Sequence, residues 1–98
     1  MPFSSTNAAP VVEKVKERKL YPEARVIVLD DDINTYQHVV SSLMKIIPQM
    51  NEDKAWKLAS MIDSEGSAEV WSGPFEQAEL YHHQLSTEGL TMAPLERT

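Results

Sequence analysis

The sequence contains no cysteine, and this absence removes several classes of function. Without thiols, the chain has no disulfides, no zinc-thiolate sites and no cysteine nucleophile. Long hydrophobic runs are missing too. No stretch reaches the roughly 18 apolar residues of a membrane span, and residues 1–9 lack the apolar core of a signal peptide. Neither membrane spanning nor secretion is supported, and we expect a cytoplasmic protein.

Positive charge is scarce as well. The 98 residues include nine Lys and Arg against 15 Asp and Glu, which gives a formal net charge of −6. The basic residues lie mostly before Leu20 or stand singly, whereas nucleic-acid binding needs a basic face. We therefore expect no nucleic acid and no membrane as a partner. The acidic balance leaves room for cationic partners.

The length predicts one domain and a tail, and 42% hydrophobic residues suffice for a modest core. Residues 1–10 are small, polar and bounded by proline, and residues 11–19 are charged with little apolar face. This second segment is either a solvated linker or a segment that orders on a partner. Because Pro22 keeps the residue before it out of the helical region, we place the boundary there. The prediction is a flexible extension over residues 1–20 and a folded domain over residues 21–98.

Hydrophobic periodicity predicts the elements of that domain. An apolar run over residues 25–29 predicts a strand that is central or buried on both faces. Asn34 is the expected N-cap of a helix that ends at Pro48, and Asn51 and Gly66 are the expected limits of a second helix. The apolar stripes of these two helices are Tyr36, Val39, Val40, Leu43 and Ile47, and then Ala55, Leu58, Ala59 and Ile62.

The second half of the domain follows the same logic. Alternation over residues 67–72 predicts a strand, and Pro74 fits the first turn of a third helix that ends before Gly89. The core stripe of this helix is Phe75, Ala78, Tyr81 and Leu85. Residues 90–95 form the expected last strand. The order is β-α-α-β-α-β, which predicts an α+β fold, a small sandwich of a three-stranded antiparallel sheet packed on helices.

The stretch V-I-V-L-D-D-D over residues 26–32 is the main candidate for a site. Four β-favouring residues end in Asp30, Asp31 and Asp32, and a helix follows directly. The acids either cap that helix and complement its dipole, or form a site for a cation such as an ammonium group, where each charge-assisted hydrogen bond is worth about 1.5–3 kcal/mol. Both interpretations stay open on the residue pattern alone.

Two familiar acidic sites do not fit this stretch. An EF-hand loop that starts at Asp30 needs glycine where Thr35 stands and a bidentate glutamate where Ser41 stands. A receiver-type phosphoacceptor belongs to a five-stranded α/β fold, for which the chain is too short.

The histidines do not form a recognisable site. His82 and His83 are adjacent, and neighbours on a helix point about 100° apart, so we expect a solvated face rather than a metal pair. His38 lies on the polar side of its predicted helix. There is no Ser-His-Asp set, phosphate loop or recognisable pair of catalytic carboxylates. We expect no enzyme, no cofactor and no metal.

The segment R-V-I-V-L-D-D-D-I-N-T-Y-Q-H-V-V-S-S-L-M-K-I-I-P resembles the ClpS family of N-end-rule adaptors of the Clp protease. The segments V-W-S-G-P-F-E-Q-A-E-L-Y-H-H-Q-L and G-L-T-M-A-P-L-E resemble its cyanobacterial branch. The resemblance covers about residues 21–96. It implies a non-catalytic β-α-α-β-α-β domain that binds the N-terminal residue of a substrate protein and hands the protein to a Clp ATPase of the ClpA or ClpC type. It also implies that the N-terminal extension assists delivery.

The same resemblance assigns roles to individual residues. The family's Asn-Asp pair and its His, which grip the substrate α-amino group, align with Asp30, Asp31 and Asp63. The Asn and the His are thus both replaced by acids. A glutamate that contacts the N-domain of the ATPase aligns with Glu76. The side-chain pocket corresponds to Asn34, Tyr36 in place of a gating Met, Val39, Ala59 and Ile62.

Three hypotheses follow. The first is an N-degron adaptor whose Asp30, Asp31 and Asp63 hold the α-amino group while Leu or Phe enters the pocket, with Asp32 merely structural. The second is a divalent-cation site at Asp30–Asp32. The third is a modulator of the Clp ATPase that has lost degron binding because Asp63 replaces the family His.

Overall fold

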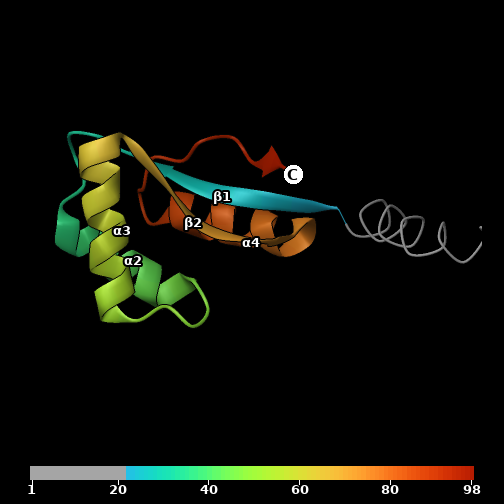
Figure 1. Ribbon diagram of the computed structural model, residues 1–98, viewed down its shortest axis with the longest axis horizontal. Coiled ribbons are helices and arrows are strands. Elements are labelled where there is room, and N and C mark those ends of the chain that lie inside the picture. The colour runs from blue at the N-terminus through green and yellow to red at the C-terminus, as the bar shows by residue number, and fades with distance from the viewer. Residues whose placement is uncertain (1–21) are drawn as a thin grey trace, which may run out of the picture.

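The computed structural model describes residues 22–98, so the predicted extension over residues 1–20 lies outside the described residues. The elements are β1 (Glu23–Leu29), α2 (Tyr36–Ile46), α3 (Glu52–Glu65), β2 (Ser67–Pro74), α4 (Phe75–Thr87) and β3 (Glu96–Arg97). The predicted order β-α-α-β-α-β and the small α+β fold are confirmed (Figure 1). None of the helices in the described part is long and apolar enough to cross a membrane.

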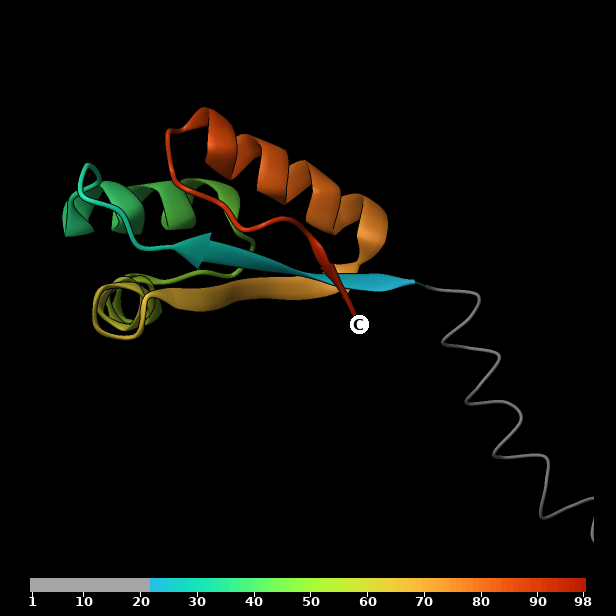
Figure 2. The ribbon, with the colours of Figure 1, turned by 90° about the horizontal axis from the view of Figure 1, so that it is seen from above.

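The sheet is antiparallel, and β1 is its central strand, as predicted, in the order β2-β1-β3. Side chains of β1 alternate: Ala24, Val26 and Val28 are buried, whereas Arg25 and its outward neighbours are only partly covered. Figure 2 shows the reason, because α2 and α4 lie on the same side of the strands and leave the other face open. On that open face Arg25 pairs with the carboxylates of Glu69 and Glu96. Burial on both faces was therefore the wrong alternative.

The core lies between the sheet and the helices. The predicted stripes supply most of it, since the buried members include Val39, Val40, Leu43, Ile47, Ala55, Leu58, Ala59, Ile62, Ala78 and Leu85. Phe75 and Tyr81 pack against this core from its edge. Tyr36 is the exception. It is 39% exposed, because it stands at the first turn of α2, beyond the edge of the core.

The ends of α2 and α3 follow the predicted chemistry at two points and depart from it at one. Asn51 caps α3 by accepting a hydrogen bond from the Lys54 amide, and Gly66 ends the helix in the left-handed conformation. The N-cap of α2 is Thr35, not Asn34, and its hydroxyl accepts from the His38 amide at 3.1 Å. Both residue types are good caps. The Asn34 side chain is engaged elsewhere, with Asp31 and with the distant Gly89 carbonyl.

The last strand was misplaced by the sequence pattern. Residues 90–95 form no strand; β3 is Glu96–Arg97, and Met92 makes only an isolated bridge with Val28. Pro94 lacks the amide hydrogen that a continuous ladder needs. The segment before it still follows β1, because the Leu29 amide donates to the Thr91 carbonyl at 2.8 Å. Pro74 is likewise the last residue of β2 and precedes α4 rather than standing in its first turn.

Two of the three histidines tie helices to distant carbonyl groups. Nε2 of His38 lies 2.8 Å from the Glu88 carbonyl oxygen, and Nε2 of His82 lies 2.8 Å from that of Ala93. A carbonyl oxygen can only accept, so each Nε2 carries the proton. The prediction of a wholly solvated histidine pair is therefore wrong for His82. His83 is exposed, as predicted.

Gly66 gives a direct test of how α3 ends. Its φ is +91°, and a Cβ built there would meet no atom within 4 Å. The cost of Gly66→Ala is therefore backbone strain alone, about 1–2 kcal/mol of unfolding free energy. Urea denaturation should show this loss, while Glu65→Ala, at the exposed preceding position, should stay within about 0.5 kcal/mol of the unmodified protein. Equal stability of the two variants would contradict the left-handed assignment.

Candidate functional site

The site begins where β1 ends, at the carboxylate of Asp31. Its Oδ1 accepts from the backbone amides of Ile33 at 2.9 Å and of Asn34 at 2.7 Å. Its Oδ2 accepts from the Asn34 side-chain amide and from the Thr91 hydroxyl, both at 2.7 Å. An ionised carboxylate offers about four lone-pair sites. All of them are engaged, so Asp31 holds the connection between β1 and α2 in one conformation.

This hydrogen bonding sets the charge of Asp31. The Asn34 amide, followed by the Thr91 hydroxyl, the Asn34 side chain and the Ile33 amide, lowers the pKa of the Asp31 carboxyl far below its usual range. Each donor favours the ionised form, and the small penalty from burial does not offset them. Asp31 therefore carries a full negative charge throughout the neutral and mildly acidic range.

Asn34 and Thr91 also fasten this connection to the segment that follows α4. The Asn34 side-chain amide donates a second hydrogen bond to the Gly89 carbonyl at 3.0 Å. Lys45 on α2 reaches Glu88 at 2.8 Å. The Asn34 side chain is thus engaged by Asp31 and by the distant Gly89 carbonyl, which explains why Thr35 takes the N-cap position instead.

Asp63 lies on the last turns of α3, and its partner is Tyr36. The Tyr36 hydroxyl donates to Asp63 Oδ2 at 2.7 Å. That bond is the main cause of the raised pKa of Tyr36, to which the charges of Asp63 and Asp30 also contribute. The Tyr36 ring lies 6.0 Å from the ring of Trp56, centroid to centroid. The structure thus joins Tyr36 and Asp63 directly, with Asp30 near enough to act on the same hydroxyl.

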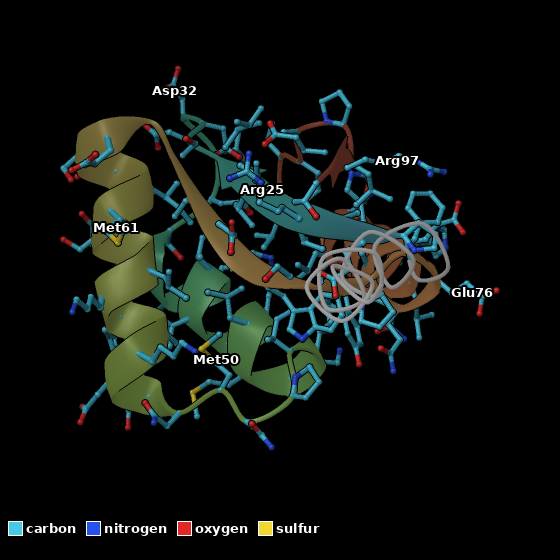
Figure 3. The ribbon with its side chains drawn as sticks, turned by 45° about the vertical axis from the view of Figure 1, so that its right-hand side comes forward. Arg25, Asp32, Met50, Met61, Glu76 and Arg97 are labelled. Carbon is cyan, nitrogen blue, oxygen red and sulfur yellow. The ribbon has the colours of Figure 1, made fainter. Side chains whose placement is uncertain are left out.

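Asp30 and Asp32 have more freedom than Asp31. The Asp30 amide donates to the Gly66 carbonyl at 2.9 Å, which fixes its backbone beside the end of α3. Its side chain is exposed, and so is that of Asp32, which points outward in Figure 3. Within residues 22–98, no group of three or more acidic or histidine side chains is arranged to hold a metal ion. The described residues therefore give no support to a divalent-cation site at Asp30–Asp32.

A small cavity opens among these residues. Its walls are Val28, Leu29, Asp30, Asp31, Asn34, Val39, Ile62, Leu90 and Thr91, and its volume is about 20 Å³. The predicted pocket residues Asn34, Val39 and Ile62 line it, together with Asp30 and Asp31. Ala59, Tyr36 and Asp63 are not among its walls. Ala59 is buried in the core instead.

Leu90 and Thr91 are the wall residues that sequence patterns missed. They follow Gly89, at the start of the segment predicted to be a strand, and nothing in their local pattern points to a distant cavity. The only signal was the family-like segment G-L-T-M. Their position depends on the hydrogen bonds of the Thr91 hydroxyl to Asp31 and of the Leu29 amide to the Thr91 carbonyl.

Comparison with known proteins decides the family. The family model described as ATP-dependent Clp protease adaptor protein ClpS matches residues 19–97. The chain belongs to the ClpS family. The resemblance seen in the sequence is thereby confirmed, and the family model covers both the acidic connection and the segment with Leu90 and Thr91.

Several cyanobacterial relatives place the chain within that family. It is 62% identical over 79 residues to the ATP-dependent Clp protease adapter protein ClpS of Thermosynechococcus vestitus, covering 81% of this chain and 84% of the relative. It is 60% identical over 80 residues to that of Synechocystis sp., covering 82% of each chain. Identity to the ClpS of Synechococcus elongatus is 32% over 79 residues, 81% of this chain and 83% of the relative. These relatives are named as adapters, not as enzymes, and the cyanobacterial branch is confirmed.

Glu76 lies apart from the cavity that this ClpS domain carries. It is exposed in the first turn of α4. In Figure 3 it projects from one end of the domain, while Asp32 marks the other end, where β1 meets α2. Contacts made at Glu76 and at the cavity therefore involve separate surfaces.

Proposed function

We propose that this chain is a substrate adaptor that binds the free α-amino group and the hydrophobic first side chain of a protein and delivers that protein to a Clp ATPase. One observation carries the proposal. Asp30 and Asp31 of the β1–α2 connection stand on the wall of a cavity whose other walls are largely apolar, with Asp63 of α3 nearby. A cationic group beside an apolar group is the ligand that such a surface favours.

The α-ammonium of a peptide fits the acids. Its reference pKa is about 7.7–8.0, so it is mostly charged near neutrality. It offers only donors, and carboxylates offer only acceptors. Asp30 and Asp63 are proposed as direct acceptors. Asp31 contributes its negative charge, and a ligand N–H reaches its oxygens only by displacing Asn34 or Thr91. The exchange of the family His for Asp63 keeps an acceptor where the amine needs one.

The apolar walls fit a hydrophobic first side chain. Val28, Val39, Ile62 and Leu90 face the cavity together with the acids. Burying a Leu or Phe side chain is worth about 1.5–3 kcal/mol, which corresponds to roughly 10- to 150-fold in affinity. Association costs offset much of the gross interaction energy, and micromolar dissociation constants are expected.

A panel of peptides that differ only in the first residue tests this specificity. Peptides that begin with Leu, Phe, Tyr or Trp should bind about 10-fold or more tightly than the peptide that begins with Gly, measured by fluorescence anisotropy. The peptide that begins with Asp should bind most weakly, because its side-chain carboxylate is repelled by the carboxylates of Asp30 and Asp31. Equal affinity across the panel would contradict a side-chain pocket.

Delivery needs a second contact, and Glu76 is the proposed one, with the N-domain of a ClpC- or ClpA-type ATPase as the partner. Its place at the other end of the domain from the β1–α2 connection leaves the cavity free for a substrate. The alternative is an ATPase modulator without degron binding. It is favoured if the ATPase N-domain binds and every peptide of the panel fails.

A further inference from the structure

The contact between Tyr36 and Asp63 spans the two helices that wall the cavity. Tyr36 is the first residue of α2, and Asp63 lies in the last turns of α3. The same two helices supply Val39 and Ile62 to the cavity. A hydrogen bond of 2.7 Å between them therefore ties together the parts that a ligand must fit between.

The Tyr36 hydroxyl is a hydrogen-bond donor to Asp63, as an ammonium N–H of a bound ligand would be. It donates to a carboxylate oxygen, and it does so in the field of Asp63 and Asp30. Their charges raise the pKa of Tyr36 further above its ordinary value, so the hydroxyl keeps its proton and remains a donor at all physiological pH values. A carboxylate oxygen has few lone pairs, and one at Oδ2 is already in use.

The cavity itself is small in this state. Its volume of about 20 Å³ has room for one water molecule. A Leu or Phe side chain is larger than one water molecule, so the walls must separate before such a group can be fully buried there. The link between α2 and α3 opposes that separation.

We propose that the Tyr36–Asp63 contact is an internal latch on the amine site: the Tyr36 hydroxyl holds the acceptor that an incoming α-ammonium needs and must be displaced before the ligand binds. This inference rests on the proposed function. The latch lowers affinity for every ligand and makes release of Tyr36 a step in binding. Substrates that can displace the hydroxyl, by offering a charged amine together with an apolar side chain, are the ones admitted.

Tyr36 has room to move once released. The residue is 39% exposed, and its ring packs in a tilted arrangement, 35° between planes, against Trp56, which is 41% exposed. Trp56 is therefore a built-in reporter of the ring's position. The other tryptophan, Trp71, packs edge-on against Tyr81 of α4 and is not part of the Tyr36–Asp63 contact.

The test compares Tyr36→Phe with Tyr81→Phe, which removes the same group from a tyrosine of α4 that is not part of the cavity wall. With a peptide that begins with Leu, Tyr36→Phe should bind about 2- to 10-fold more tightly than the unmodified protein, because one hydrogen bond no longer has to be broken. Tyr81→Phe should bind as the unmodified protein does. Trp56 fluorescence should change on peptide binding in the unmodified protein.

A double-mutant cycle separates the latch from a simple loss of contact. Asp63→Ala should weaken binding, and Tyr36→Phe should add nothing in that background, because the acceptor it frees is gone. Unchanged or weaker binding by Tyr36→Phe alone would overturn the latch while leaving the proposed function standing. Absence of binding by every variant to any free-amine peptide would overturn both.

Discussion

Asp31→Ala is expected to lower the free energy of unfolding by about 2–3 kcal/mol and to abolish most peptide binding. The substitution removes the acceptor of four hydrogen bonds, from Ile33, Asn34 twice and Thr91. Each hydrogen bond to a charged group is worth about 1.5–3 kcal/mol when fully protected. Two of these bonds are exposed and are partly replaced by water, which reduces the sum. Denaturant titration measures the loss.

The pH dependence of this difference has a defined sign. The pKa of Asp31 in the folded protein lies below its unfolded value of about 3.9, so the unfolded chain binds the proton more readily. The stabilisation by the ionised carboxylate is therefore fully present above about pH 5 and declines as the pH falls below about 4. The gap in stability between the unmodified protein and Asp31→Ala should narrow over that range.

Asp32→Ala is the matched control. Asp32 is the next residue, carries the same charge and is exposed, with its side chain directed to solvent (Figure 3). Its removal should change stability by no more than about 0.5 kcal/mol. Equal losses for the two variants would mean that net charge, rather than the hydrogen bonds of Asp31, stabilises the connection.

Most of the fold could be predicted from the sequence because the signals are local. Val39, Val40 and Leu43 recur at helical spacing and are buried, and the caps at Asn51 and Gly66 are set by neighbouring residues. Such patterns need no knowledge of the rest of the chain. The exposure of Tyr36 broke the pattern, because its hydroxyl bonds with Asp63 at the surface.

The candidate site was harder to predict than the fold, because it is assembled from segments that are distant in the sequence. The sequence left both helix capping and a cation site open for Asp30, Asp31 and Asp32, and the local pattern did not assign a separate role to each of them. One of the four hydrogen bonds that distinguish Asp31 comes from Thr91, a partner 60 positions away that no local pattern indicates. The N-cap of α2 was wrongly assigned to Asn34 for the same reason, since the Asn34 side chain donates to the distant Gly89 carbonyl. The family resemblance aligned Asp63 with the amine site, but not its hydrogen bond to Tyr36.

The second large effect concerns the ligand. N-acetylation of a peptide that begins with Leu should reduce its affinity by about 100-fold or more. The acetyl group removes the positive charge and leaves one amide N–H, so at least two charge-assisted hydrogen bonds of about 1.5–3 kcal/mol are lost. Affinity for the free peptide should also fall above about pH 8, where the α-amine loses its proton.

The same acids should account for that loss. Asp30→Asn and Asp63→Asn keep a similar size and an oxygen acceptor but remove the charge. Each substitution should weaken binding of the free peptide and leave binding of the acetylated peptide almost unchanged. A matched substitution at Asp32, which lies outside the cavity wall, should affect neither.

The most direct measurement is anisotropy with two labelled peptides that share a sequence beginning with Leu, one free at its N-terminus and one acetylated. The proposed adaptor function predicts micromolar binding of the free peptide and none of the acetylated peptide at the same concentrations. Equal affinity for the two would show that the carboxylates beside the cavity do not recognise an α-amino group, and the proposed function would be wrong.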